Sequence, residues 1–77
     1  MATVKTSIPG VFYRKPSPDE PNFVEDGDTV EEGQVIGLVE VMKNFNEVKS
    51  TAAGTLKQFL VENEGEVGVG DDIAVIE

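Results

Sequence analysis

The sequence contains no cysteine, no histidine and no tryptophan among its 77 residues, and only 6 lysines and arginines. Without cysteine, disulfides, thiolate chemistry and thiolate metal sites are excluded. Without histidine, the chain lacks the side chain that most often serves as a general base near neutral pH and most often binds metals. These absences weigh against an enzyme that acts alone.

Long apolar runs and a basic surface are also absent. No apolar stretch approaches the roughly 20 residues of a membrane span, and the opening MATVKTSIPG lacks the apolar core of a signal peptide. The 15 acidic residues give a net charge of −9, which disfavours nucleic acid and anionic membranes as partners. We expect a single cytoplasmic domain, residues 1–77, that is monomeric in isolation. Its acidity either simply keeps a small domain soluble or favours partners with basic surfaces.

Motifs for phosphate or calcium binding are missing too. No glycine-rich phosphate loop appears, and none of the three serines has a candidate base nearby. The acidic run EDGDTVEE, residues 25–32, contains Asp26 and Asp28 but lacks the third ligand and the glycine of a calcium-binding loop. We interpret this run as a solvated turn.

What the sequence does contain is an internal repeat. Shifted by 37 residues, FVEDGDTVEEGQVIGLVE (23–40) aligns with LVENEGEVGVGDDIAVIE (60–77) without a gap, and 6 of these 18 positions are identical. Upstream, Gly10 aligns with Gly54 at an offset of 44 instead. Because 44 exceeds 37 by seven, the first half carries seven extra residues between Tyr13 and Phe23. This stretch, RKPSPDEPNF, is rich in proline, so we expect an ordered loop there.

Within each half, apolar residues form short runs bounded by Gly, Asp, Asn or Pro, and no helical periodicity competes. Two half-motifs that cannot cover their apolar faces alone are expected to share one core about a pseudo-twofold axis. The predicted fold is therefore a small all-β sandwich or flattened β-barrel. Its predicted strands are residues 3–7, 11–13, 22–24, 35–41, 46–49, 54–61 and 73–76. Its predicted core is Val24, Val30, Ile36, Leu38, Leu56, Leu60, Val67, Ile73 and Val75.

The segment EVMKNFNE, Glu40 to Glu47, places Lys43 where a strand should reverse. Two-residue hairpin loops prefer Asn-Gly, Asp-Gly or Gly-Gly because their central positions need positive φ, and Met42-Lys43 is none of these. Most lysines in loops are simply solvated, but unsuited turn residues within a regular pattern indicate a functional constraint. Glu40 aligns with the last residue, Glu77, so only the first half runs on into this hairpin. We predict that Lys43 projects at one end of the barrel, opposite both termini, and is suited to modification.

At these residues the chain resembles the biotinyl domains of biotin-dependent carboxylases, specifically the biotin carboxyl carriers of acetyl-CoA carboxylase. PGVFYRKPSPDEPNFVEDGDTVEEGQVIGLVEVMKNFNEVKS is similar to that family's FYR strand, PSP-containing loop, GD and GQ turns and Glu-Ala-Met-Lys-Met hairpin. GTLKQFLVENEGEVGVGDDIAVIE is similar to its second half. The resemblance implies a barrel-sandwich hybrid of two four-stranded antiparallel sheets with a protruding thumb loop. It assigns the thumb to Ser17, Pro18, Asp19, Glu20, Pro21 and Asn22.

The resemblance also implies roles for the hairpin residues. Lys43 matches the lysine whose ε-amine is joined to biotin, Met42 the methionine before it, and Glu40 the family's glutamate. Val41 stands where alanine is usual, and Asn44 stands where methionine or another apolar residue is usual. Because asparagine tolerates positive φ, Asn44 is expected to favour the backbone of the turn.

A family member of this kind is a non-catalytic carrier. Its covalent biotin takes an activated carboxyl group from biotin carboxylase to carboxyltransferase, and acetyl-CoA carboxylase and fatty acid synthesis are the expected setting. Biotin protein ligase would attach the cofactor. A lipoyl acyl-carrier domain is an alternative with the same barrel. In lipoyl domains, however, the lysine usually follows Asp, whereas Lys43 follows Met42, and lipoyl domains lack the thumb. A carrier of another acyl-CoA or amide carboxylase, an unmodified β-module and a freestanding enzyme are further alternatives.

Overall fold

The computed structural model describes residues 2–77, which form eight strands and no helix. The strands make two four-stranded sheets, ordered β1-β8-β6-β3 and β5-β4-β2-β7, in which all neighbours are antiparallel. The strands are β1 (Ala2–Lys5), β2 (Gly10–Tyr13), β3 (Thr29–Val30), β4 (Val35–Val41), β5 (Asn44–Lys49), β6 (Gly54–Phe59), β7 (Gly65–Val67) and β8 (Asp72–Ile76). The molecule is flattened, with extents of 32 × 28 × 19 Å. The predicted all-β class and pair of four-stranded sheets are confirmed, and residues 2–77 offer no helix suited to crossing a membrane.

The two sheets repeat each other in detail. Strands β1, β8, β6 and β3 occupy the same order in one sheet as β5, β4, β2 and β7 in the other. The connecting loops repeat as well: the Thr6 N–H donates to the Asp71 carbonyl at 3.1 Å, and the Ser50 N–H donates to the Gln34 carbonyl at 2.8 Å. Thr6 and Ser50 are both buried, and each hydroxyl donates to the carbonyl two residues further on. The predicted pseudo-twofold relation is therefore present down to single hydrogen bonds.

The core lies between the sheets, and a β-bulge decides which residues reach it. In β4, Ile36 is an extra residue between Val35, which pairs with Lys49, and Gly37. A bulge interrupts strict alternation along a strand, so Ile36 and Val39 are both buried while Leu38 between them is not. An equivalent register shift in the β1–β8 pair has the same effect in the second half.

Because the bulges change which residues of β4 and β8 face inward, the predicted core needs correction. The buried members of the predicted set are Val24, Val30, Ile36, Leu56, Val67 and Ile73. The prediction is wrong for Leu38 and Val75, which are half-buried, and for Leu60, which is exposed. The core residues that the prediction missed are Val4, Phe12, Val39, Val48, Ala74 and Ile76.

Three strand predictions also need correction. Residues 22–24 form no strand, because the Phe23 N–H donates to the Arg14 carbonyl at 2.8 Å and closes a loop instead of joining a ladder. Strands β3 and β7 were missed, since runs of two and three residues are too short to show alternation. The predicted strand 35–41 matches β4 at both ends, and the ends of the other predicted strands that are present differ by at most two residues.

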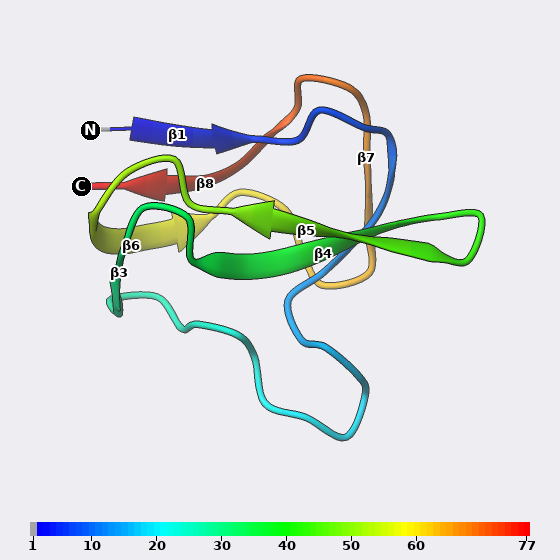
Figure 1. Ribbon diagram of the computed structural model, residues 1–77, viewed down its shortest axis with the longest axis horizontal. Coiled ribbons are helices and arrows are strands. Elements are labelled where there is room, and N and C mark those ends of the chain that lie inside the picture. The colour runs from blue at the N-terminus through cyan, green and yellow to red at the C-terminus, as the bar shows by residue number, and fades with distance from the viewer. Residues whose placement is uncertain (1) are drawn as a thin grey trace.

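The hairpin of β4 and β5 projects from one end of the molecule, as Figure 1 shows, and the two chain ends lie together at the other end. The loop between β2 and β3 projects separately from the side (Figure 1). The predicted placement of the hairpin opposite the termini is confirmed.

Candidate attachment site at the β4–β5 hairpin

The hairpin turn has the geometry that its residues disfavour. Val41 pairs with Asn44, which leaves Met42 and Lys43 as a two-residue loop with φ angles of 49° and 69°. Positive φ at both central positions is the requirement of a type I′ turn, and the left-handed region costs a residue with a side chain roughly 1–2 kcal/mol. Asn44 is the first residue of β5 and has no positive φ, so the expectation that it serves the left-handed backbone is wrong.

The tip of the hairpin is open to solvent. Met42 is 90% exposed and Phe45 is 58% exposed, and Lys43 is exposed between them. Within residues 2–77, no carboxylate lies within 4.0 Å of the Lys43 amine. The amine is therefore accessible and carries no ion pair that a modification would break.

Behind the tip, the outer face of the hairpin is held by Tyr13 of β2. Its hydroxyl donates a hydrogen bond of 2.9 Å to Oε1 of Glu40, and its ring lies 6.1 Å from the ring of Phe45 at a tilt of 56°. The hydrogen bond to the Glu40 carboxylate raises the pKa of Tyr13, and burial and the negative charges of Glu40 and Glu64 add to the rise. Val41 lies against the buried core. The sequence prediction included Glu40 and Val41 but missed Tyr13 and Phe45, because their contact depends on the register of β2 against β4.

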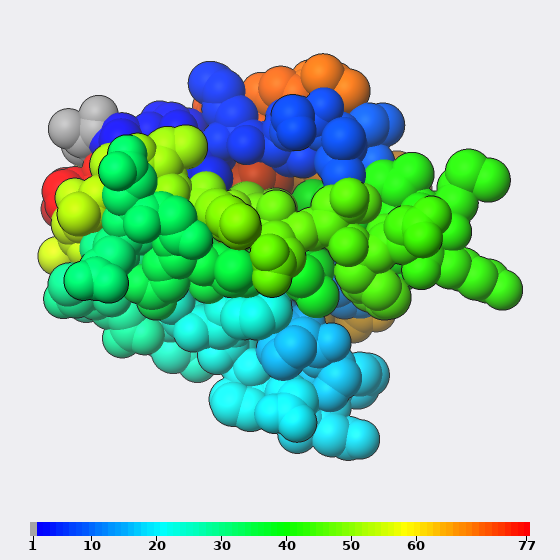
Figure 2. Space-filling view, viewed as in Figure 1, coloured from blue at the N-terminus to red at the C-terminus, as the bar shows by residue number. Residues whose placement is uncertain are grey.

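The predicted thumb, Ser17 to Asn22, lies in the exposed loop that follows β2. Its turn is closed by a 3.1 Å hydrogen bond from the Glu20 N–H to the Ser17 carbonyl. At its base, the Arg14 guanidinium lies 4.2 Å from the centre of the Phe59 ring and also contacts Glu25, with Nη2 at 3.4 Å from Oε1. In Figure 2 the thumb and the hairpin are two separate projections with a notch between them.

A groove of about 460 Å³ occupies the space between thumb and hairpin base. Its lining includes the aromatic rings of β2 and β5, together with Pro16 before the thumb and Pro18 within it. Its lining residues are Tyr13, Lys15, Pro16, Ser17, Pro18, Phe45, Asn63 and Glu64. The structure thus brings the predicted thumb next to the hairpin that carries Lys43.

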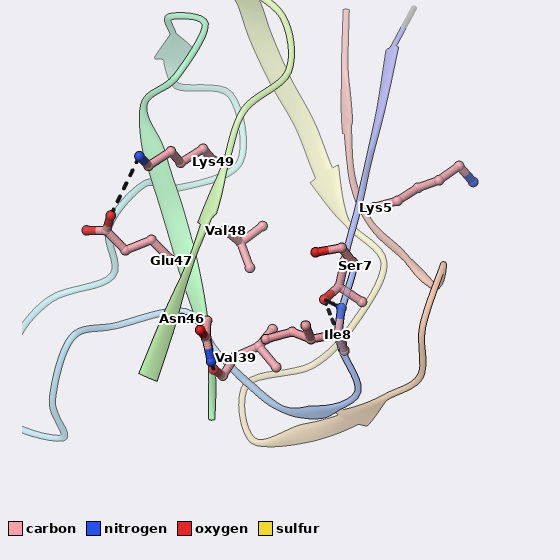
Figure 3. Close-up of a pocket in the computed structure, with 9 residues that line it drawn as sticks. Lys5, Ser7, Ile8, Val39, Asn46, Glu47, Val48 and Lys49 are labelled. Carbon is pink, nitrogen blue, oxygen red and sulfur yellow. Dashed lines mark hydrogen bonds and ion pairs between the residues drawn. The ribbon is translucent and has the colours of Figure 1, made fainter. Parts of the chain in front are cut away.

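A second groove, of about 470 Å³, lies between β5 and the end of β1 (Figure 3). Val39 and Val48 form its apolar floor. Its two lysines are already paired, Lys49 with Glu47 at 3.8 Å and Lys5 with Asp72 outside the groove. This groove therefore presents no unpaired charged group to a ligand.

Metal binding finds no support in the described part of the chain. Residues 2–77 contain no group of three histidine, cysteine, aspartate or glutamate side chains arranged around a common point. In the acidic run 25–32, Oδ2 of Asp28 accepts a 2.9 Å hydrogen bond from the Glu25 N–H across the turn at 26–27. The interpretation as a solvated turn is confirmed for residues 26–27 but is wrong for Thr29 and Val30, which form β3 and bury Val30 in the core.

Comparison with known proteins agrees with the fold. The sequence profile of the family described as biotin-requiring enzyme matches residues 2–76. The biotin carboxyl carrier protein of acetyl-CoA carboxylase from Chlamydia trachomatis is 39% identical over 70 residues, covering 91% of this chain and 43% of that protein. The chloroplastic carrier of the same name from Glycine max is 39% identical over 74 residues, covering 96% of this chain and 28% of that protein. The chain thus spans less than half the length of either relative.

Among solved structures, the urea carboxylase of Kluyveromyces lactis matches 99% of this chain with 6% of its own, at a TM-score of 0.80 and 28% identity. The profile match covers almost all of the chain, and the curated relatives and the solved structure agree with it. The chain belongs to the family of biotin-requiring enzymes.

Proposed function

We propose that the chain is a biotin carrier domain, residues 1–77, in which Nζ of Lys43 forms an amide bond with the carboxyl group of biotin. The observation that carries the proposal is the exposed Lys43 amine, which has no ion pair within residues 2–77, in a two-residue turn at the end of a compact barrel. The names of the curated relatives support it, because they describe biotin carboxyl carriers.

The residues of the hairpin would present the cofactor and leave the chemistry to it. Biotin, when bound, supplies a ureido nitrogen that can carry a carboxyl group. Lys43 supplies a flexible aliphatic stem, and the barrel fixes the base of that stem, which raises the effective concentration of the attached group at each partner. Glu40, Val41, Met42 and Asn44 shape the hairpin that the partners meet. The thumb lies across the groove from this hairpin, where it would contact partner enzymes.

The proposed partners are those that a biotin carboxyl carrier of acetyl-CoA carboxylase would need. They are biotin protein ligase, which attaches the cofactor, and the biotin carboxylase and carboxyltransferase of acetyl-CoA carboxylase, between which the carrier moves. The domain itself would be a non-catalytic, monomeric carrier. The cytoplasm stays a prediction, because the Glycine max relative is named chloroplastic.

Intact mass tests the attachment. The chain is incubated with biotin, ATP and a biotin protein ligase. Its intact mass is then measured, and the modified residue is located by peptide mapping. We expect a gain of one biotin less one water on Lys43, and no gain after Lys43→Arg, whose unfolding free energy should stay within about 0.5 kcal/mol of wild type.

Four other lysines serve as internal controls for the same experiment, because they lie away from the two-residue turn: Lys5, Lys15, Lys49 and Lys57. Labelling of these lysines in the Lys43→Arg chain would contradict the assignment. A gain only with lipoate and a lipoate ligase would make the chain a lipoyl domain, and no gain with either would leave an unmodified β-module.

A further inference from the structure

Tyr13 is the side chain of β2 that reaches both strands of the hairpin on its outer face. Glu40 of β4 and Phe45 of β5 are direct partners across the hairpin. The Tyr13 hydroxyl donates to Glu40 at 2.9 Å, while its ring lies 6.1 Å from that of Phe45. Tyr13 therefore connects both hairpin strands to a third strand, β2. Its contact on β4, Glu40, is three residues before Lys43.

The internal repeat supplies a control for this contact. The residues equivalent to Tyr13 and Glu40 are Lys57 and Glu77, at the offsets of 44 and 37. There the same pair exists as an ion pair, with 3.3 Å between Lys57 Nζ and Glu77 Oε1. The barrel thus accepts a lysine at this position in the half that has no hairpin. The tyrosine is found only in the half that carries Lys43. We therefore assign its role to the hairpin and not to the barrel fold.

The hairpin needs support of this kind because its turn does not provide it. Met42 and Lys43 both adopt positive φ without being glycine or asparagine. An isolated two-stranded hairpin is marginally stable in water, and a third strand is what stabilises it. On the outer face of β2, Val11 is paired directly with Glu40, and Tyr13 adds the side-chain contacts to Glu40 and Phe45.

Resting on the proposed function, we propose that Tyr13 is a positioning residue for Lys43, which holds the hairpin at a fixed angle to the sheet through Glu40 and Phe45. A ligase then meets the acceptor amine already oriented. When only a fraction of the carrier molecules holds the hairpin in the orientation that the ligase binds, the apparent dissociation constant equals the intrinsic constant divided by that fraction. A lost hydrogen bond to a charged, partly exposed acceptor corresponds to a change of about three- to tenfold.

Steady-state kinetics of a biotin protein ligase with carrier variants tests the proposal. Tyr13→Phe keeps the ring and removes the hydroxyl, and Tyr13→Lys copies the ion pair of the second half and removes the ring. We expect both to raise KM for the carrier by about three- to tenfold with kcat unchanged. Lys57→Tyr, the matched substitution in the half without the hairpin, should leave both constants at the wild-type value. Wild-type KM in both Tyr13 variants, or a change confined to kcat, would overturn the proposal.

A second measurement separates this role from general stability and from the proposed function. Amide hydrogen exchange at Val41 and Asn44, the pair that closes the turn, should accelerate in Tyr13→Phe, while exchange at the equivalent end of β8 stays at the wild-type rate. Glu40→Gln keeps an acceptor oxygen and should retain most of the protection. If wild type takes no biotin, the proposed function fails, yet exchange still decides whether Tyr13 holds the hairpin. Unchanged exchange at the tip in Tyr13→Phe would refute the positioning role on its own.

Discussion

Gly10 and Gly54 stand at equivalent positions in the two halves, and each lies against the backbone of the equivalent glutamate. A Cβ on Gly10 would meet the carbonyl oxygen of Glu40, and a Cβ on Gly54 would meet that of Glu77, both far inside contact distance. Since a backbone carbonyl cannot move aside as a side chain can, we expect Gly10→Ala and Gly54→Ala to destabilise the fold by similar amounts, about 1–3 kcal/mol each. Urea unfolding of both variants measures this. As a control, Gly68→Ala meets only the side chain of Asp71 at 3.6 Å, and should cost less.

Met42 is a site where stability and function should separate. Its φ of 49° suits asparagine better than methionine, so we expect Met42→Asn to stabilise the protein by about 0.5–1 kcal/mol. Because Met42 is 90% exposed, no core packing is lost. We also expect the variant to be labelled more slowly by the ligase, since the exposed methionine next to Lys43, the proposed acceptor, is replaced. A lower melting temperature for Met42→Asn would show that the positive φ of Met42 does not destabilise the turn.

The single tyrosine of the chain, in the absence of tryptophan, allows its ionisation to be followed alone. The hydrogen bond to Glu40 raises the pKa of Tyr13, so tyrosinate absorbance should appear at a higher pH than the ordinary value of about 10. A folded pKa above the unfolded one means that the stabilising contribution is complete below the unfolded pKa and is lost as pH rises through the folded pKa. Alkaline conditions should therefore destabilise wild type more than Tyr13→Phe. Glu40→Gln, which removes the charge, should lower the midpoint, and an unshifted midpoint would contradict the contact.

Deletion of the thumb should leave the barrel folded. Residues 17–21 are exposed, and the second half connects its equivalent strands without such a loop. We expect removal of Ser17 to Asn22 to change the unfolding free energy by no more than about 1 kcal/mol, while interaction with the carboxylase subunits changes. Arg14→Ala at the loop base is the contrasting variant, because it removes the contact with Phe59 and the pairing with Glu25, and it should cost more. Unfolding of the deletion variant would show that the thumb is part of the fold.

Sequence reasoning succeeded where the signal was local or repeated. The hairpin lysine, the extra loop and the equivalence of the halves could all be read from turn residues and from the two offsets. It failed where a bulge changed parity: alternation from Ile36 places Leu38 inward, whereas the extra residue in β4 turns Val39 inward instead. It also missed Tyr13. Its partner Glu40 lies 27 residues further along the chain, and the two side chains meet only because of how β2 is aligned with β4.

The two chain ends lie where the second half would have its own hairpin. Ala2 pairs with Ile76 as Asn46 pairs with Val39, so β1 and β8 already form the two arms of a turn that the chain does not make. Circular permutation is tolerated where termini are close together. By the repeat offsets, a linker equivalent to Val41–Asn44 placed between Glu77 and the first residue would close this gap, and the thumb would be the natural place to open the chain. The fold thus has room for a second exposed two-residue turn, at the end opposite Lys43.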